Sequence, residues 1–195
     1  MNENINFMLP DNTPPAFIIK EIVHTAIETH VYISTEIGEP WEYIDLIHTL
    51  NMANPDDVIL IHINTPGGNL DTGIQLCNAM KNCQAEVVTI LEGQGFSLGS
   101  LLFLSGHRKI AQSNSMLMIH NVSSGIIGKG HEMRQQINAT EKWFSKLARD
   151  IYIPFLSEDE FTRILDGEDF YILSEEVQER LNRMEQELEP TEDYE

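Results

Sequence analysis

A short glycine-rich stretch, Gly93 to Ser100, constrains the fold of this chain more than any other feature. It separates a run rich in β-branched residues, Glu86 to Leu91, from an apolar run, Leu101 to Leu104. A strand that ends in glycines and turns at once into a helix exposes the corner residue beside the unpaired N–H groups of that helix. The sequence therefore predicts Ser97 as a nucleophile, which needs a base, an orienting carboxylate and oxyanion donors.

Length and charge limit the class of protein. With 195 residues, 42% of them hydrophobic, we expect a single domain over 16–188, between a variable N-terminal segment (1–15) and an acidic tail (189–195). We also expect a cytoplasmic protein, because no apolar stretch approaches the roughly 18 residues of a membrane span and no basic secretion signal opens the chain. The net charge of −19 disfavours nucleic acid and anionic membranes as partners.

Cysteines and histidines give little sign of a disulfide framework or a metal site. Cys77 and Cys83 are the only cysteines and are expected to be free thiols in a reducing compartment. His24 and Glu28 would share a face if their segment is helical, but one such pair offers too few ligands for a metal. His131-Glu132 lacks the second histidine of an H-E-x-x-H motif, so we expect no metal.

Strand-like and helix-like segments alternate along the chain, which predicts an α/β fold with a parallel sheet. Strands are expected over 30–34, 57–64, 85–91, 108–111 and 116–120, and helices over 39–53, 70–82, from Ser97, 132–151, from Ser157 and from Ser174. The segment 17–23 suits either a helix or a strand. The β-branched segment 57–64 is typical of a strand covered on both faces. The helix 132–151, about 30 Å long, is expected to project from a small sheet and to suit an oligomerisation arm.

Two polar residues downstream of Ser97 have the chemistry of its missing partners. His120 ends a predicted strand, and Asp169 lies in a short loop between two predicted helices. The motif Gly95-x-Ser97-x-Gly99 also matches the nucleophile elbow of α/β-hydrolases, but in those enzymes the chain order is Ser, Asp, His. Each residue alone also has a plain structural interpretation, Ser97 as a helix N-cap and His120 as a hydrogen-bonded strand-end residue.

Four segments, in this order and spacing, resemble the landmarks of the ClpP family, the proteolytic subunit of the Clp protease. They are Asn64–Asn69, Gly93–Gly99, Met118–His120 and Asp169–Glu176. The similarity covers roughly 31–177. It implies an α/β fold with a ClpP/crotonase-like core of repeated β-β-α-type units and a protruding long handle helix within about 123–153.

The resemblance implies a serine endopeptidase that hydrolyses peptide bonds inside an oligomeric chamber through an acyl-enzyme and without a cofactor. Ser97 is implied as the nucleophile, His120 as the general base and then acid, and Asp169 as the carboxylate that orients the imidazole. Asp166 and Glu168 are carboxylates close to Asp169 in the sequence.

The resemblance also implies which main-chain groups meet the substrate. The N–H groups of Gly68 and Leu98 would form the oxyanion hole, and the absence of a Cβ at Gly67 and Gly68 would let the substrate carbonyl approach. An extended substrate would pair with the edge formed by Val122, Ser123, Ser124 and Gly125.

For partners, the resemblance implies a homo-oligomer of two stacked seven-membered rings, interlocked by the handles, that acts on polypeptides. Phe170 replaces an arginine that helps to tie the rings together, and Asn121-Val122 replaces the usual Gln-Pro. The N-terminal segment and the acidic tail also depart from the family, which leaves an AAA+ unfoldase partner open. The alternatives are a catalytically silent ring or scaffold subunit, a virus-encoded capsid-maturation protease, and an acyl-CoA-handling crotonase relative.

Overall fold

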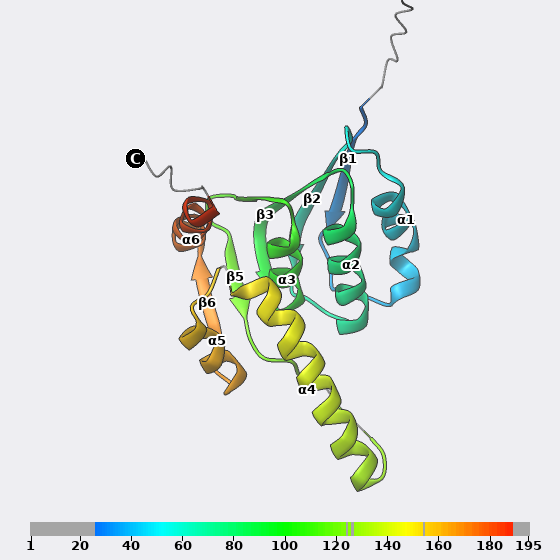
Figure 1. Cartoon of the computed structure of the whole chain (residues 1–195), viewed down its shortest axis with the longest axis vertical. Helices are drawn as coiled ribbons and strands as arrows, with labels where there is room; N and C mark the ends of the chain where they lie inside the picture. The colour runs from blue at the N-terminus through cyan, green and yellow to red at the C-terminus, as the bar shows by residue number, and fades with distance from the viewer. Residues whose placement is uncertain (1–25, 124, 126, 154, 189–195) are drawn as a thin grey trace, which may run out of the picture.

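One six-stranded sheet with helices packed on it organises the chain in this computed structural model, which describes residues 26–123, 125, 127–153 and 155–188 (Figure 1). The strands are β1 (Glu28–Ile33), β2 (Val58–Thr65), β3 (Glu86–Phe96), β4 (Arg108–Ala111), β5 (Met116–Ile119) and β6 (Phe170–Leu173). The helices are the 3₁₀ helix η1 (Pro40–Tyr43), α1 (Ile44–Met52), α2 (Leu70–Asn82), α3 (Leu98–Ser105), α4 (Gly130–Tyr152), α5 (Glu158–Leu165) and α6 (Ser174–Leu188).

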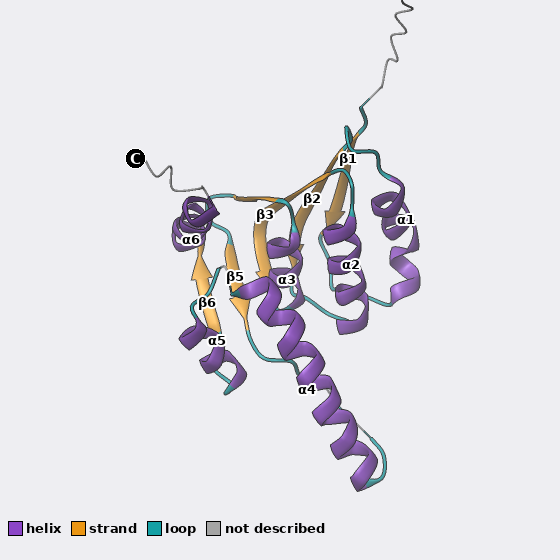
Figure 2. Cartoon of the chain, viewed as in Figure 1, coloured by secondary structure: helices purple, strands orange, loops and turns teal. Residues whose placement is uncertain are grey.

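The strand order is β1-β2-β3-β5-β6 (Figure 2). Strand β4 lies off this path and also pairs with β3. All pairings are parallel except that of β6, which runs antiparallel to β5. Helices connect β1 to β2, β2 to β3 and β3 to β4, as parallel pairing requires. The α/β class predicted from the sequence is confirmed.

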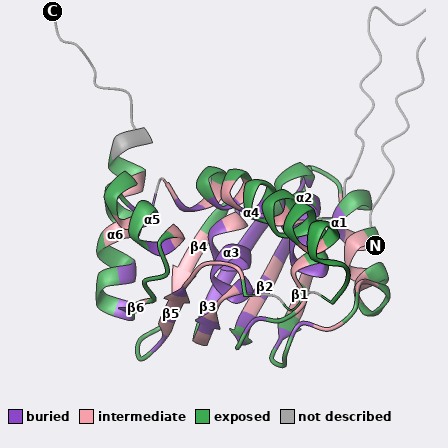
Figure 3. Ribbon diagram, turned by 90° about the horizontal axis from the view of Figure 1, so that it is seen from below, coloured by how far each residue is buried: buried purple, intermediate pink, exposed green. Residues whose placement is uncertain are grey.

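Helices α1 to α4 lie on one face of the sheet (Figure 3). In β2, Ile59, Ile61 and Ile63 are buried on this face, whereas Leu60 and His62 on the opposite face are only half-buried. The expectation that this strand is covered on both faces is therefore wrong for the single described chain. Its β-branched density reflects packing under the helices on one side, while the other side is open.

Strand β3 is longer than predicted and has two partners on one side. It continues through the glycines to Phe96, so that β4 pairs with its first half and β5 with its second. Gly95 permits this close approach, because a Cβ there would lie 2.6 Å from a methyl of Leu91 and 2.9 Å from one of Leu117. The turn is thereby confined to a single residue, Ser97.

Several predicted elements are confirmed, with small changes at their ends. Helix α2 has the predicted bounds 70–82, and Ser157 caps α5 by accepting a hydrogen bond from the Glu160 N–H at 3.2 Å. Asp169 does not lie between two helices, since β6 follows it directly. The ambiguous segment 17–23, and with it 1–15 and 189–195, lies outside the described residues.

Helix α4 has 23 residues, which corresponds to about 35 Å, and its N-terminal half extends beyond the sheet (Figure 1). Its buried residues, Phe144, Ala148 and Tyr152, all lie in the C-terminal half. Among the described residues, no helix combines the length and the apolar character needed to cross a membrane, α4 included.

A charged clamp joins α5 to α6. The Arg180 guanidinium donates to both Glu160 carboxylate oxygens at 2.7 and 3.0 Å, to Glu176 at 2.7 Å and to the Phe155 carbonyl at 3.3 Å. The Arg180 side chain is only 12% exposed. Its hydrogen bonds are the main reason why the pKa of Glu160 is lowered to about 2.

We predict that Glu160→Gln lowers the free energy of unfolding at pH 7 by about 1.5–3 kcal/mol, the range for hydrogen bonds to charged groups. Because the pKa of Glu160 is lower in the folded state than in the unfolded state, the wild-type protein is more stable than the variant by the full amount above pH 4.5, the unfolded pKa. This difference in the free energy of unfolding disappears as the pH falls towards 2. Urea unfolding between pH 2 and 7 measures this. Glu158→Gln, which removes an exposed pair with Arg149, is the matched control and should cost less than about 1 kcal/mol. Equal effects of the two variants would contradict the prediction.

Candidate active site

Ser97 occupies the corner between β3 and α3 in a strained backbone conformation. Its φ of 54° and ψ of −118° lie in a region that L residues rarely adopt. The Ser97 N–H donates to the Met118 carbonyl at 2.8 Å, and the Ser97 carbonyl accepts from the Ser100 N–H at 3.0 Å. Ser97 is the N-cap residue of α3, as the structural interpretation expected, but its hydroxyl makes no capping hydrogen bond and the side chain is free for another partner.

That partner is His120. Its Nε2 lies 2.7 Å from the Ser97 Oγ, within hydrogen-bond distance. The two residues come together because β3 and β5 are parallel neighbours, with Phe96 opposite Met118, and both chains leave the sheet at the same edge. A hydroxyl hydrogen-bonded to an imidazole is the arrangement by which a serine becomes nucleophilic.

A buried hydroxyl pair links this corner to α4. Ser100 Oγ donates to the Ser97 carbonyl at 2.6 Å and lies 2.7 Å from the Tyr152 hydroxyl. Because the single Ser100 proton is directed to that carbonyl, the Tyr152 O–H donates to Ser100 Oγ. Tyr152 is 1% exposed, and burial raises the pKa of its hydroxyl, so it stays protonated as a donor.

Asp169 and His120 lie at the same end of the β5–β6 ladder. The last pair of this antiparallel ladder is Ile119 with Phe170, so His120 directly follows it on one chain and Asp169 directly precedes it on the other. The Asp169 side chain is exposed, and among the described residues no hydrogen bond joins it to His120.

The two neighbouring carboxylates are otherwise occupied. Glu168 accepts from the Arg163 guanidinium at 2.8 and 2.5 Å, which lowers the pKa of Glu168. Asp166 is the C-cap of α5. Arg163 also lies 5.0 Å above the Phe170 ring, so the residue that departs from the family pattern has a contact within its own chain.

The glycine pair after β2 is held by Thr65 and by an extended residue, Ile37. Thr65 Oγ1 donates to the Thr35 carbonyl at 2.6 Å and accepts from the Gly67 N–H at 3.1 Å. Ile37 donates its N–H to the Gly67 carbonyl at 2.7 Å. Gly68 has a φ of 149°, and a Cβ there would lie 2.2 Å from the Ile37 carbonyl oxygen. The glycine is therefore required by main-chain packing, whereas the sequence interpretation invoked room for a substrate carbonyl.

Six of the predicted site residues line one small cavity of about 40 Å³. They are Gly68, Ser97, Leu98 and His120, and, from the predicted substrate edge, Val122 and Ser123. Apolar lining residues come from α2, α3 and α4: Leu70, Leu101, Phe144 and Tyr152. Gly125 is exposed away from the cavity, and Ser124 lies outside the described residues. Val122 and Ser123 belong to no strand.

The supporting residues were not recognised from the sequence. Thr65 carried a usable signal, because a threonine directly before Pro66 and two glycines often bonds to the main chain of the turn. Nothing in the sequence indicates that Tyr152, 52 residues after Ser100, reaches its hydroxyl.

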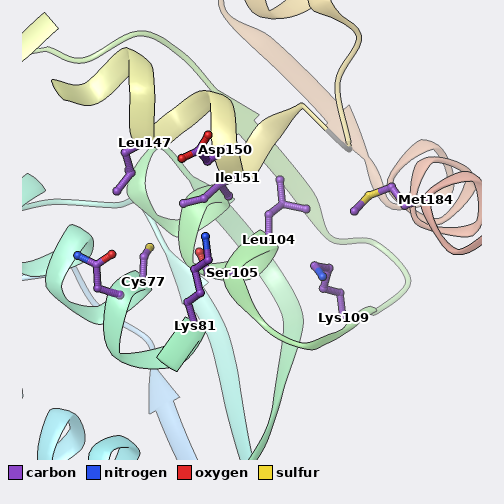
Figure 4. Close-up of a pocket in the computed structure, with 10 residues that line it drawn as sticks. Cys77, Lys81, Leu104, Ser105, Lys109, Leu147, Asp150, Ile151 and Met184 are labelled. Atoms are coloured by element: carbon purple, nitrogen blue, oxygen red, sulfur yellow. The ribbon is translucent and has the colours of Figure 1, made fainter. Parts of the chain in front are cut away.

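A larger cavity of about 260 Å³ lies elsewhere, between α2, α3, α4 and α6 (Figure 4). Cys77, Lys81, Lys109 and Asp150 lie on its wall together with apolar side chains. Burial raises the pKa of the Cys77 thiol to about 11, so at neutral pH it is protonated and a poor nucleophile. This cavity shares no lining residue with the one at Ser97, which is the better candidate for chemistry.

Comparison with known proteins shows similarity to the Clp protease family. The model of the family described as "Clp protease" matches residues 19–155. The chain is also 32% identical, over 129 residues, to a protein of Deinococcus radiodurans named "ATP-dependent Clp protease proteolytic subunit". The match covers 65% of this chain, and the chain spans about 63% of the length of that relative.

We predict that Thr65→Val lowers the free energy of unfolding by about 2–4 kcal/mol, because the Thr35 carbonyl and the Gly67 N–H both lose a buried partner. Thr65→Ser keeps both hydrogen bonds and should cost only about 1 kcal/mol for the lost methyl group. Denaturant unfolding of the two variants checks this. A serine variant as unstable as the valine variant would show that packing, not the hydroxyl, stabilises the loop.

Proposed function

Because this chain belongs to the Clp protease family, we propose that it is a serine endopeptidase with Ser97, His120 and Asp169 as its catalytic residues. The observation that carries the proposal is the 2.7 Å contact between Ser97 Oγ and His120 Nε2 at a strained strand–helix corner. Strain at a single non-glycine residue that is also hydrogen-bonded to an imidazole favours a catalytic role over a structural one.

The proposed reaction begins with attack of Ser97 Oγ on a peptide carbonyl carbon while His120 Nε2 takes the hydroxyl proton. His120 then gives this proton to the leaving amine, and the C–N bond breaks to leave an ester on Ser97. A water molecule then attacks the ester carbonyl carbon while His120 takes its proton. His120 gives this proton to Ser97 Oγ as the carboxylic acid leaves, which restores the hydroxyl. No cofactor enters any of these steps.

Asp169 is the proposed partner of the other imidazole nitrogen. For Nε2 to accept the serine proton, Nδ1 must carry a hydrogen, and a carboxylate that accepts it fixes this tautomer. The ladder favours Asp169, because one further pair beyond Ile119 and Phe170 would place it opposite His120, and the pairing of Glu168 with Arg163 argues against its neighbour. Rotation of the exposed Asp169 side chain towards Nδ1 would complete the triad.

The oxyanion hole is proposed to consist of the N–H groups of Gly68 and Leu98. Both residues line the cavity at Ser97, and Leu98 is the first residue of α3, where N–H groups lack partners within the helix. Two such donors stabilise the charge on the carbonyl oxygen as the tetrahedral intermediate forms.

The proposed substrate is an extended polypeptide with an apolar side chain near the scissile bond. The cavity next to Ser97 has an apolar wall that includes Leu70, Leu101 and Phe144, which suits such a side chain. Residues 122–125 would bind the substrate backbone by strand addition, which gives affinity with little sequence preference. Burial of both free cysteines fits a reducing compartment, and we place this activity in the cytoplasm.

The proposed assembly is a homo-oligomer of stacked rings, heptameric by analogy with the family, with α4 as the interlocking handle. Half of α4 lies beyond the sheet, and its exposed apolar residues Ile137 and Trp143 are available for contacts between protomers. An AAA+ unfoldase partner remains open, because the termini depart from the family pattern.

We predict that Ser97→Ala lowers kcat/KM for peptide hydrolysis by about 10⁴- to 10⁶-fold. A fluorophosphonate should modify the wild-type protein at Ser97, and native mass spectrometry should give the same particle mass for both proteins. Labelling at another residue, or none in an assembled particle, would contradict the proposal and favour the catalytically silent scaffold.

A second prediction concerns the choice of carboxylate. Asp169→Asn should lower kcat by about 10⁴-fold with little change in KM, because the wrong imidazole tautomer is favoured. The matched control Glu168→Gln should retain kcat within about twofold, since Glu168 bonds to Arg163 on the surface. If Glu168→Gln is the damaging change, the carboxylate assignment is wrong even if Ser97 is the nucleophile.

A further inference from the structure

Four polar side chains form a continuous hydrogen-bonded chain across β1, β2 and the end of β3. His30 Nδ1 lies 3.0 Å from His62 Nε2, His30 Nε2 lies 2.9 Å from a Glu28 carboxylate oxygen, and His62 Nδ1 lies 2.7 Å from a Glu92 carboxylate oxygen. Alternation along β1 and β2 places the two histidines on the sheet face away from the helices. Tyr32 stacks on His62 with ring centroids 4.4 Å apart and limits its movement.

Two carboxylates lie against the outer ring nitrogens. Glu28 contacts His30 Nε2 and Glu92 contacts His62 Nδ1, and an ionised carboxylate only accepts, which favours an N–H on each outer nitrogen. The inner nitrogens, His30 Nδ1 and His62 Nε2, then face one another across 3.0 Å.

We propose that this histidine pair binds a divalent transition-metal ion such as Zn²⁺ between its inner nitrogens. Two zinc–nitrogen bonds of 2.0–2.1 Å at a tetrahedral angle place the nitrogens about 3.3–3.4 Å apart. The present separation is 3.0 Å, so a shift of a few tenths of an ångström suffices. The outer N–H groups already donate to carboxylates, as in the carboxylate–histidine–metal arrangement of known sites.

Charge and access favour the same ligand. The His30 side chain is 41% exposed and that of His62 12%, so the pair is reachable from solvent and still partly sheltered. Glu28 and Glu92 place negative charge next to the histidine pair, and the net charge of the chain is −19, which attracts cations. Imidazole nitrogens select zinc, nickel or copper over magnesium and calcium.

The site has two ligands from the protein. Within 26–123, 125, 127–153 and 155–188, no third His, Cys, Asp or Glu side chain completes a set of three, so the remaining positions of the ion are open to water. No metal was expected from the sequence, because His24–Glu28 offered a single histidine and His131–Glu132 lacked a second one, whereas here two imidazoles meet. His30 and His62 are 32 residues apart and meet only through the parallel pairing of β1 with β2.

Calorimetric titration of the full chain with ZnCl₂, and absorption spectra with Co²⁺, test the proposal. The wild-type protein should bind one ion at this pair. His30→Gln and His62→Gln should each bind that ion with an affinity at least tenfold lower. Glu92→Gln should weaken binding by about 10- to 100-fold, the usual effect of removing a partner of a metal-bound histidine. Mg²⁺ should not compete.

Two controls keep the outcome decisive. His48→Gln, which changes an exposed histidine on α1, should titrate like the wild type, and His120 is present in all these proteins, so any ion bound there cancels in the comparison. Thermal unfolding with and without Zn²⁺ should show a rise in Tm for the wild type and none for His62→Gln. Identical titrations of the wild type and His62→Gln would overturn the proposal and leave the pair a structural hydrogen bond. The test is independent of peptidase activity.

Discussion

The backbone of Ser97 is the constraint on which the rest of the site depends. Its positive φ is unfavourable for a residue with a side chain, and the surrounding structure must hold it. Strand β5 accepts its N–H, α3 binds its carbonyl through Ser100, and Tyr152 fixes Ser100 in turn. The same strand β5 ends at His120, so the element that holds the corner also delivers the imidazole to the hydroxyl.

Much of the fold could be predicted because it rests on local patterns. Dense β-branched residues identified β2 and β3, and proline–glycine turns marked the start of α2. The capping box at Ser157 predicted where α5 begins. Ser97 and His120 were proposed as site residues for a related reason, since each lies where a predicted strand ends, and strand ends can be recognised in a sequence.

The remaining features depend on contacts between distant residues. The glycines after Leu91 were interpreted as a turn, yet in the fold they continue β3, because β5 supplies a partner for the backbone that they leave accessible. Strand β6 has only four residues and is stabilised by pairing with β5. Such a short segment shows no clear alternation of apolar and polar residues, so it was not predicted as a strand. The roles of Thr65 and Ile37 likewise depend on a main-chain approach that no sequence pattern encodes.

Helix α4 packs on the rest of the protein through its C-terminal half only. Its free half lies outside the globule, and its last residue before the turn, Tyr152, holds the hydroxyl that supports the Ser97 carbonyl. A tilt of the outer half would be transmitted along a helix of about 35 Å to two hydrogen bonds next to Ser97. The shape of the corner is thus tied mechanically to whatever the protruding half touches.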